Sequence, residues 1–147
     1  GVTHTQKTVS NIDGMNKTIE LLSKDFKGLC FVNLVEFDSE YGHRRNPLGY
    51  AKCIEEYDIQ IGEFISKMHD DDLLMVTADH GNDPIHHGTD HTREMVPLLI
   101  YSKSIKNGRK LDNQLSFACI GRTVIENFNL KPNNQIGDVL TDVLEDE

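Results

Sequence analysis

Three short apolar runs, with helical and polar stretches between them, limit the folds that this chain can adopt. Residues 28–35, 73–77 and 96–101 are each of strand length and rich in apolar side chains, as expected for buried strands. Between the first two runs, apolar residues recur every three or four positions from Pro47 to Met68, which predicts an amphipathic helix. Strand, helix and strand without a hairpin signal are typical of a right-handed parallel crossover.

The sequence therefore predicts the α/β class, with a mostly parallel sheet flanked by helices. Two further helices are expected, a short one over residues 16–23 and another over residues 116–128. The chain has 147 residues, which suits one compact domain over residues 1–147. It begins with Gly1 rather than Met, so we expect a fragment, a processed chain or a tagged product.

Composition excludes some classes of partner. The net charge is −9 and the basic residues are scattered, which argues against a nucleic-acid surface. No apolar run approaches the roughly 18 residues that a bilayer-spanning helix needs, so no membrane partner is expected. The three cysteines are far apart and form no CxxC pair. They predict three reduced, buried thiols in a cytoplasmic protein.

Acidic residues and histidines follow two of the apolar runs. Because ligands of parallel sheets bind beyond the carboxyl ends of the strands, we expect these side chains to lie close together. Carboxylate and imidazole suit a divalent cation such as Mn²⁺ or Zn²⁺. The set is too large for one catalytic metal and about right for two that share a phosphate. The candidate ligands are Asp38, His43, Asp79, His80 and His91.

Each candidate also has an ordinary structural interpretation. Asp79 and His80 could cap a loop, although the turn signal of residues 81–84 favours a site toward which both point. Composition does not decide which histidine of residues 86–91 binds metal, and Asp90 is a candidate acceptor for a ligand imidazole. Arg44 and Arg45 follow His43. They could hold a phosphate, or equally form a solvated loop pair or an ion pair with the acidic surface.

Several segments together resemble the phosphopentomutase family of the alkaline phosphatase superfamily. They are residues 7–11, 31–35, 42–45, 49–51, 77–84, 88–94 and 96–97. The Asp79–Asn82 segment has a counterpart in cofactor-independent phosphoglycerate mutases, so it is not specific. The segment Gly88-Thr89-Asp90-His91-Thr92-Arg93-Glu94 distinguishes the two and carries the resemblance.

The resemblance implies interconversion of the 1-phosphate and 5-phosphate of ribose and deoxyribose. The family uses two Mn²⁺ ions, a phosphorylated threonine and a sugar bisphosphate activator. By motif match, Asp38, His43 and His91 would hold one metal, and Asp79 with His80 would hold the other. Arg44 and Arg45 are the expected substrate contacts.

The family's nucleophilic threonine, one bridging aspartate and the cap domain have no counterpart in this sequence. The chain therefore resembles the C-terminal part of an alkaline-phosphatase-like core, and we expect no catalytic nucleophile in it. Its expected partners are a phosphopentose and the N-terminal segment of the same protein, and alone it should be inactive. Two alternatives stay open: a phosphoglycerate mutase or phosphatase of the same superfamily, and a non-enzymatic metal-binding domain.

Overall fold

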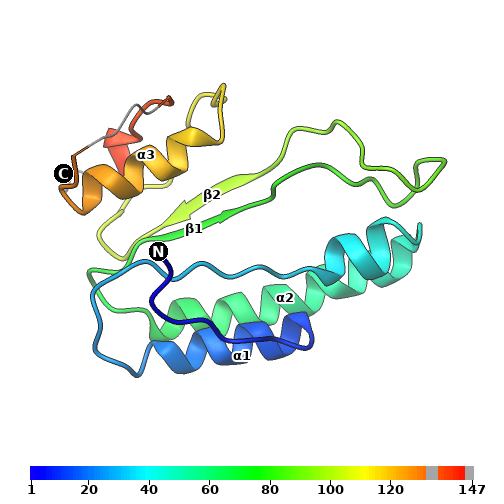
Figure 1. Ribbon diagram of the computed structural model, residues 1–147, viewed down its shortest axis with the longest axis horizontal. Coiled ribbons are helices and arrows are strands. Elements are labelled where there is room, and N and C mark those ends of the chain that lie inside the picture. Colours follow the sequence, from blue (N-terminus) through cyan, green and yellow to red (C-terminus); the bar gives the residue numbers. More distant parts are fainter. Residues whose placement is uncertain (132–135, 145–147) are drawn as a thin grey trace. The chain divides into compact units, whose positions relative to one another are not determined.

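A computed structural model describes residues 1–131 and 136–144, and Figure 1 shows its helices and strands. The chain forms two compact units. Unit 1 contains Gly1–His69 and Met75–Leu99, and unit 2 contains Asp70–Leu74 and Ile100–Glu147. Because residues 132–135 and 145–147 lie outside the described part, the single domain expected over residues 1–147 stays a prediction. All the candidate site residues lie in unit 1.

Two helices pack against each other in unit 1. Helix α1 (Asn11–Leu21) begins at an N-cap, Ser10, whose hydroxyl accepts a hydrogen bond from the Asp13 amide at 3.0 Å. This cap explains why the helix begins five residues before the expected position. Helix α2 (Pro47–Lys67) confirms the expected amphipathic helix, with Asn46 as its N-cap and Pro47 in the first turn. The two helices lie side by side in Figure 1.

A π-helical turn, η1 (Phe37–Gly42), precedes α2. The Phe37 ring meets Tyr50 and Tyr57 of α2, with centroids 5.9 and 6.0 Å away, so an aromatic cluster holds the turn on the helix. Partial burial raises the pKa of the Tyr50 phenol, and the charges of Cys53 and Asp38 add to the shift. Tyr50 therefore stays neutral beside the turn that carries Asp38.

The sheet is smaller than the sequence predicts. Strand β1 (Leu74–Thr77) and strand β2 (Leu98–Tyr101) form a two-stranded antiparallel sheet, so the mostly parallel sheet is not confirmed. Residues 28–35, expected as a strand, form none. They have no ladder partner among the described residues, and the Phe31 side chain is 86% exposed. Strand β2 begins just after Pro97, which lacks the N–H that a ladder needs.

Unit 2 contains helix α3 (Ala118–Asn127), which confirms the last expected helix, and the short η2 (Thr141–Val143). Thr123 is fully buried, and its hydroxyl donates to the Cys119 carbonyl and accepts from the Leu140 amide. All three cysteines are free thiols, but only two are buried. Cys30 is exposed because the run that contains it is unpaired, so its expected burial is wrong.

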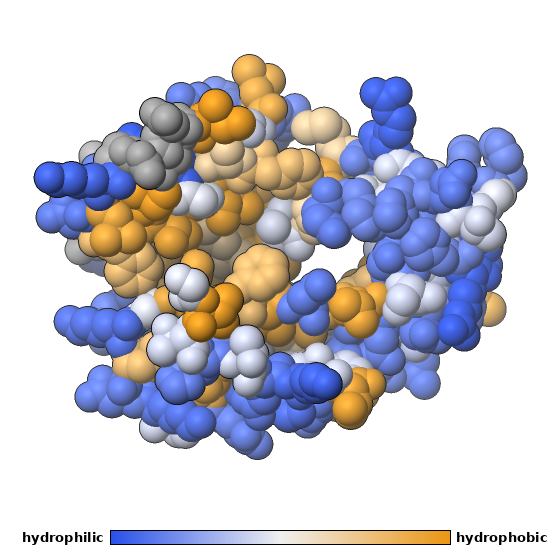
Figure 2. All heavy atoms as spheres, viewed as in Figure 1, coloured by the Kyte–Doolittle hydropathy of each residue, from blue (hydrophilic) through white to orange (hydrophobic). Residues whose placement is uncertain are grey.

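Helices long and apolar enough to cross a bilayer are absent from the residues that the structure describes. Large apolar side chains nevertheless reach the surface, where Figure 2 shows hydrophobic residues among hydrophilic ones. The most exposed in unit 1 include Leu29, Phe31, Leu48, Ile59 and Ile85. Surfaces of this kind favour association.

We therefore expect the isolated chain to self-associate. Sedimentation velocity at increasing concentration should show a rising average mass, because burial of these side chains is favourable by about 25 cal/mol for each Å² removed from water. The variant Phe31→Ser should shift the association to higher concentration, while Lys52→Ser, on the charged surface of α2, should not. A monomer whose melting temperature is sharp and independent of concentration would contradict this expectation.

Candidate metal centre

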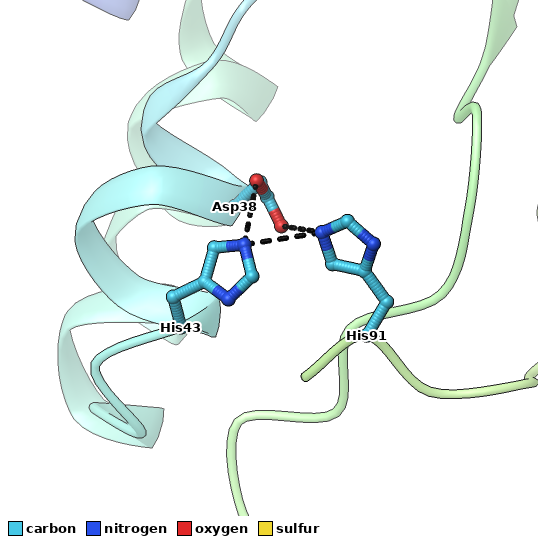
Figure 3. Close-up of side chains that lie close together, drawn as sticks. All are labelled: Asp38, His43 and His91. Atoms are coloured by element: carbon cyan, nitrogen blue, oxygen red, sulfur yellow. Dashed lines mark hydrogen bonds and ion pairs between the residues drawn. The ribbon is translucent and has the colours of Figure 1, made fainter. Parts of the chain in front are cut away.

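Three of the five predicted ligands converge in unit 1. His43 Nε2 lies 3.3 Å from Asp38 Oδ2, and His91 Nε2 lies 3.5 Å from Asp38 Oδ1. The two Nε2 atoms are 3.1 Å apart. Figure 3 shows the carboxylate and both imidazoles pointing toward one another. Among the described residues, this is the one group with the composition and spacing to hold a metal ion.

The π-helical turn brings Asp38 and His43 onto the same face. His43 donates its backbone N–H to the Asp38 carbonyl at 2.9 Å, the five-residue hydrogen bond that defines this geometry. An α-helical turn would instead place residue 42 nearest to residue 38. The local widening of the helix therefore aligns the carboxylate with the imidazole five residues later.

His91 comes from the long segment between β1 and β2. An isolated antiparallel bridge joins Gly81 to Thr92, and the Thr92 amide donates to the Gly81 carbonyl at 3.1 Å. The two backbones approach so closely that a Cβ on Gly81 would lie 2.5 Å from a Glu94 carboxylate oxygen and 2.9 Å from the Thr92 carbonyl oxygen. This bridge places His91 beside His80 on the opposite arm of the segment.

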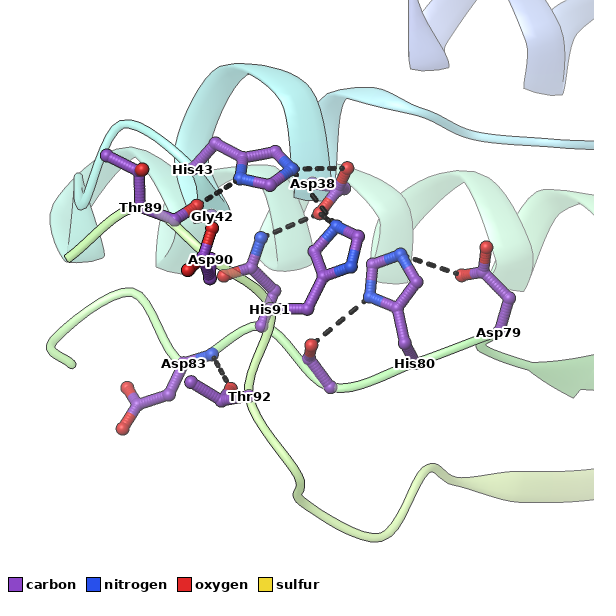
Figure 4. A network of polar contacts seen from close by, with 12 residues as sticks. Asp38, Gly42, His43, Asp79, His80, Asp83, Thr89, Asp90, His91 and Thr92 are labelled. Carbon is purple, nitrogen blue, oxygen red and sulfur yellow. Dashed lines mark hydrogen bonds and ion pairs between the residues drawn. The ribbon is translucent and has the colours of Figure 1, made fainter. Parts of the chain in front are cut away.

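The other two predicted ligands stand next to this group but outside it (Figure 4). The His80 ring stacks on His91, with centroids 3.6 Å apart, and its Nε2 lies 3.5 Å from Asp79 Oδ1. The Asp79 side chain is 89% exposed. The structure thus forms a cluster of three imidazoles with one inward carboxylate, and a second carboxylate that faces solvent.

A backbone carbonyl fixes the orientation of one imidazole. The Thr89 carbonyl oxygen lies 2.5 Å from His43 Nδ1. Because a carbonyl only accepts, the proton belongs on Nδ1 and the Nε2 lone pair faces Asp38 and His91. This arrangement is typical of metal-binding histidines. Asp90 was the candidate acceptor for a ligand imidazole, but the Thr89 carbonyl takes that place for His43. The Asp90 carbonyl accepts from Arg45 Nη2 at 2.5 Å.

The separations of the three side chains fit one small cation. Four-coordinate Zn²⁺ has bonds of about 2.0 to 2.2 Å, so its ligand atoms lie about 3.4 Å apart at the tetrahedral angle. The two imidazole nitrogens are 3.1 Å apart, and each lies 3.3 or 3.5 Å from a different oxygen of the Asp38 carboxylate. With one atom from each residue, all three ligand atoms lie within 4.8 Å of one another. Two imidazole nitrogens and a carboxylate suit Zn²⁺, Mn²⁺ or related ions. The donor set thus has room for the metal that the sequence implies.

The two arginines after His43 differ from each other. Arg44 is 67% exposed and pairs with Glu40 at 2.9 Å. Arg45 is turned inward, and its guanidinium donates to five oxygen atoms of the chain itself. Asn82, which sequence reasoning treated only as part of a turn, donates to Asp38 Oδ1 at 2.6 Å. The roles of Asn82 and Arg45 depend on distant partners, so no local signal identifies them.

Known proteins with similar sequences agree with this chemistry. Residues 1–132 match the Metalloenzyme superfamily. The phosphopentomutase of Clostridium botulinum (strain Alaska E43 / Type E3) is 53% identical over 138 residues, which are 93% of this chain and 35% of that protein. Those of Clostridium beijerinckii and Clostridium perfringens (strain 13 / Type A) are 52% identical over 139 residues, 94% of this chain and 35% of each relative. The chain thus spans about a third of their length, and it belongs to the metalloenzyme superfamily.

Proposed function

We propose that this chain is the metal-binding portion of a phosphopentomutase, an isomerase that interconverts the 1-phosphate and 5-phosphate of ribose and deoxyribose. The observation that carries the proposal is identity of more than half to phosphopentomutases over nearly the whole chain. The convergence of Asp38, His43 and His91 supports it, because a metal-dependent phosphoryl transfer needs preorganised ligands. The proposed enzyme acts in the cytoplasm, in keeping with three free thiols.

Two divalent cations, proposed to be Mn²⁺, would neutralise phosphate charge and align the attacking and leaving oxygens. Asp38, His43 and His91 would hold one of them. Asp79 and His80 would contribute to the other, and the Asp79 side chain is 89% exposed. A site with only two ligands from this chain should hold an ion poorly.

The remaining parts of the reaction belong to the longer protein. We propose that its nucleophilic threonine, its bridging aspartate and its sugar-binding cap lie outside this sequence, and that a sugar bisphosphate primes the threonine. Relatives about three times as long as this chain are consistent with that division. Arg44 is the better of the two candidate phosphate contacts, because its guanidinium reaches solvent while that of Arg45 is engaged by the chain.

The first test is metal binding by the isolated chain. Titration with Mn²⁺, followed by the electron paramagnetic resonance of the free ion, should show one tight event and a second weak or absent one. His43→Ala should abolish the tight event, because it removes one of three ligands. His80→Ala should spare it, as should His86→Ala, which alters a histidine of the same segment outside the cluster. If His80→Ala abolishes the event and His43→Ala does not, the assignment of ligands is wrong.

The second test is activity. A coupled assay of ribose 1-phosphate formation from ribose 5-phosphate, with Mn²⁺ and a sugar bisphosphate, should give turnover with the full-length protein and none with the isolated chain. Asp38→Asn in the full-length protein should lower kcat by at least about 100-fold, because a charged metal ligand becomes neutral. Absence of turnover in the full-length protein, with activity on a phosphoglycerate or a phosphate ester, would refute the proposal.

A further inference from the structure

Arg45 has a conformation that needs compensation. Its φ is +50°, in the left-handed region, where among the described non-glycine residues only Asn129 accompanies it. Arginine has no special preference for this region, unlike glycine or asparagine. Such residues persist where the surrounding contacts over-determine them, often beside functional sites. The contacts that hold Arg45 are therefore informative about what the position does.

The guanidinium of Arg45 joins η1 to the segment that carries His91. Its Nη1 has two hydrogens and three acceptors, so one hydrogen is shared; two of these acceptors are the Asp83 carbonyl at 2.7 Å and the Gly42 carbonyl at 3.1 Å. Its Nε and Nη2 donate to the carbonyls of Gly88 and Asp90, each at 2.5 Å. Thr89, between these last two, is the residue whose carbonyl orients His43. One side chain thus ties the backbone on both sides of that carbonyl.

The fifth contact of Arg45 leads to the carboxylate. Arg45 Nη1 donates to Asn82 Oδ1 at 2.6 Å, and Asn82 Nδ2 donates to Asp38 Oδ1 at 2.6 Å. Because a guanidinium only donates, the amide oxygen of Asn82 must face Arg45 and its NH₂ group must face Asp38. The same Asp38 oxygen faces His91 Nε2 at 3.5 Å. The Arg45 guanidinium therefore sets the orientation of the Asn82 amide, and through it the side of Asn82 that faces Asp38.

We propose that Arg45 and Asn82 are positioning residues that preorganise Asp38, His43 and His91 for the metal. This inference rests on the proposed function, because it takes the three side chains as metal ligands. Arg45 fixes the Thr89 carbonyl and hence the His43 ring, while Asn82 fixes the rotamer of the Asp38 carboxylate. Outer partners of metal ligands typically change metal affinity by about 10- to 100-fold when removed.

The experiment measures the Mn²⁺ affinity of the whole natural protein and of its variants in the absence of substrate. The concentration of free Mn²⁺ is followed by its electron paramagnetic resonance signal. Asn82→Ala and Arg45→Ala should each raise the Kd of one site about 10- to 100-fold. Arg45→Lys should not restore it, because three donors on one nitrogen do not span five acceptors. Arg93→Ala is the matched control: it removes a charge two residues from His91, and Arg93 is exposed, with no hydrogen-bond or ion-pair partner among the described residues.

A substitution at a glycine offers a second test that removes no polar group. A Cβ at Gly42 would lie 2.6 Å from Asn82 Nδ2, so Gly42→Ala should displace the amide from Asp38 and raise the same Kd. Gly62→Ala, where nothing lies within 4 Å of the added atom, should not. Melting temperatures measured without metal separate positioning from general destabilisation, because Asn82→Ala should change the Kd far more than the metal-free melt.

Two failures are distinguishable. If His43→Ala leaves every Mn²⁺ binding event intact, the three side chains hold no metal, and the proposed function loses its metal site. If His43→Ala abolishes one event while Asn82→Ala and Arg45→Ala bind Mn²⁺ as tightly as Arg93→Ala, the metal site stands and the positioning role is refuted.

Discussion

The candidate site depends on the hydrogen bonds of one guanidinium. Arg45 is close in sequence to Asp38 and His43 but bonds mainly to oxygen atoms of residues 82–90. A planar group with five N–H donors is suited to hold several carbonyls at fixed directions. Without it, the π-helical turn and the segment between the strands would be joined chiefly by the Asn82–Asp38 and His43–Thr89 bonds. The geometry of the three ligands follows from this link.

The fold could be predicted from the sequence where local pattern and packing agree. Helices α2 and α3 have amphipathic spacing, and both occur where expected. Residues 28–35 have the composition of a buried strand, but a strand also needs a neighbour, and none pairs with them among the described residues. The segment between β1 and β2 joins two antiparallel strands rather than parallel ones. The sequence pattern did not predict this direction, because the direction of strand pairing depends on tertiary contacts.

The site could be predicted in its residue types but not in its architecture. Asp38, His43 and His91 were recognisable because carboxylate and imidazole are the chemistry of divalent metals. The π-helical turn that aligns the first two has no composition signal. Arg45 and Asn82 were equally hidden, since four of the five acceptors of Arg45 are backbone carbonyls, a group that every residue carries. Sequence patterns identify ligands more readily than the atoms that orient them.

The close approach of Gly81 to Thr92 and Glu94 has an evolutionary consequence. Every other amino acid would place a Cβ against the Thr92 carbonyl or the Glu94 carboxylate, and the arms carrying His80 and His91 would have to separate. Selection on metal chemistry should thus act on a residue that has no functional group at all. Sequence change in this part of the chain is therefore limited by the space between the backbones at Gly81 and Thr92, as well as by the identity of the ligands.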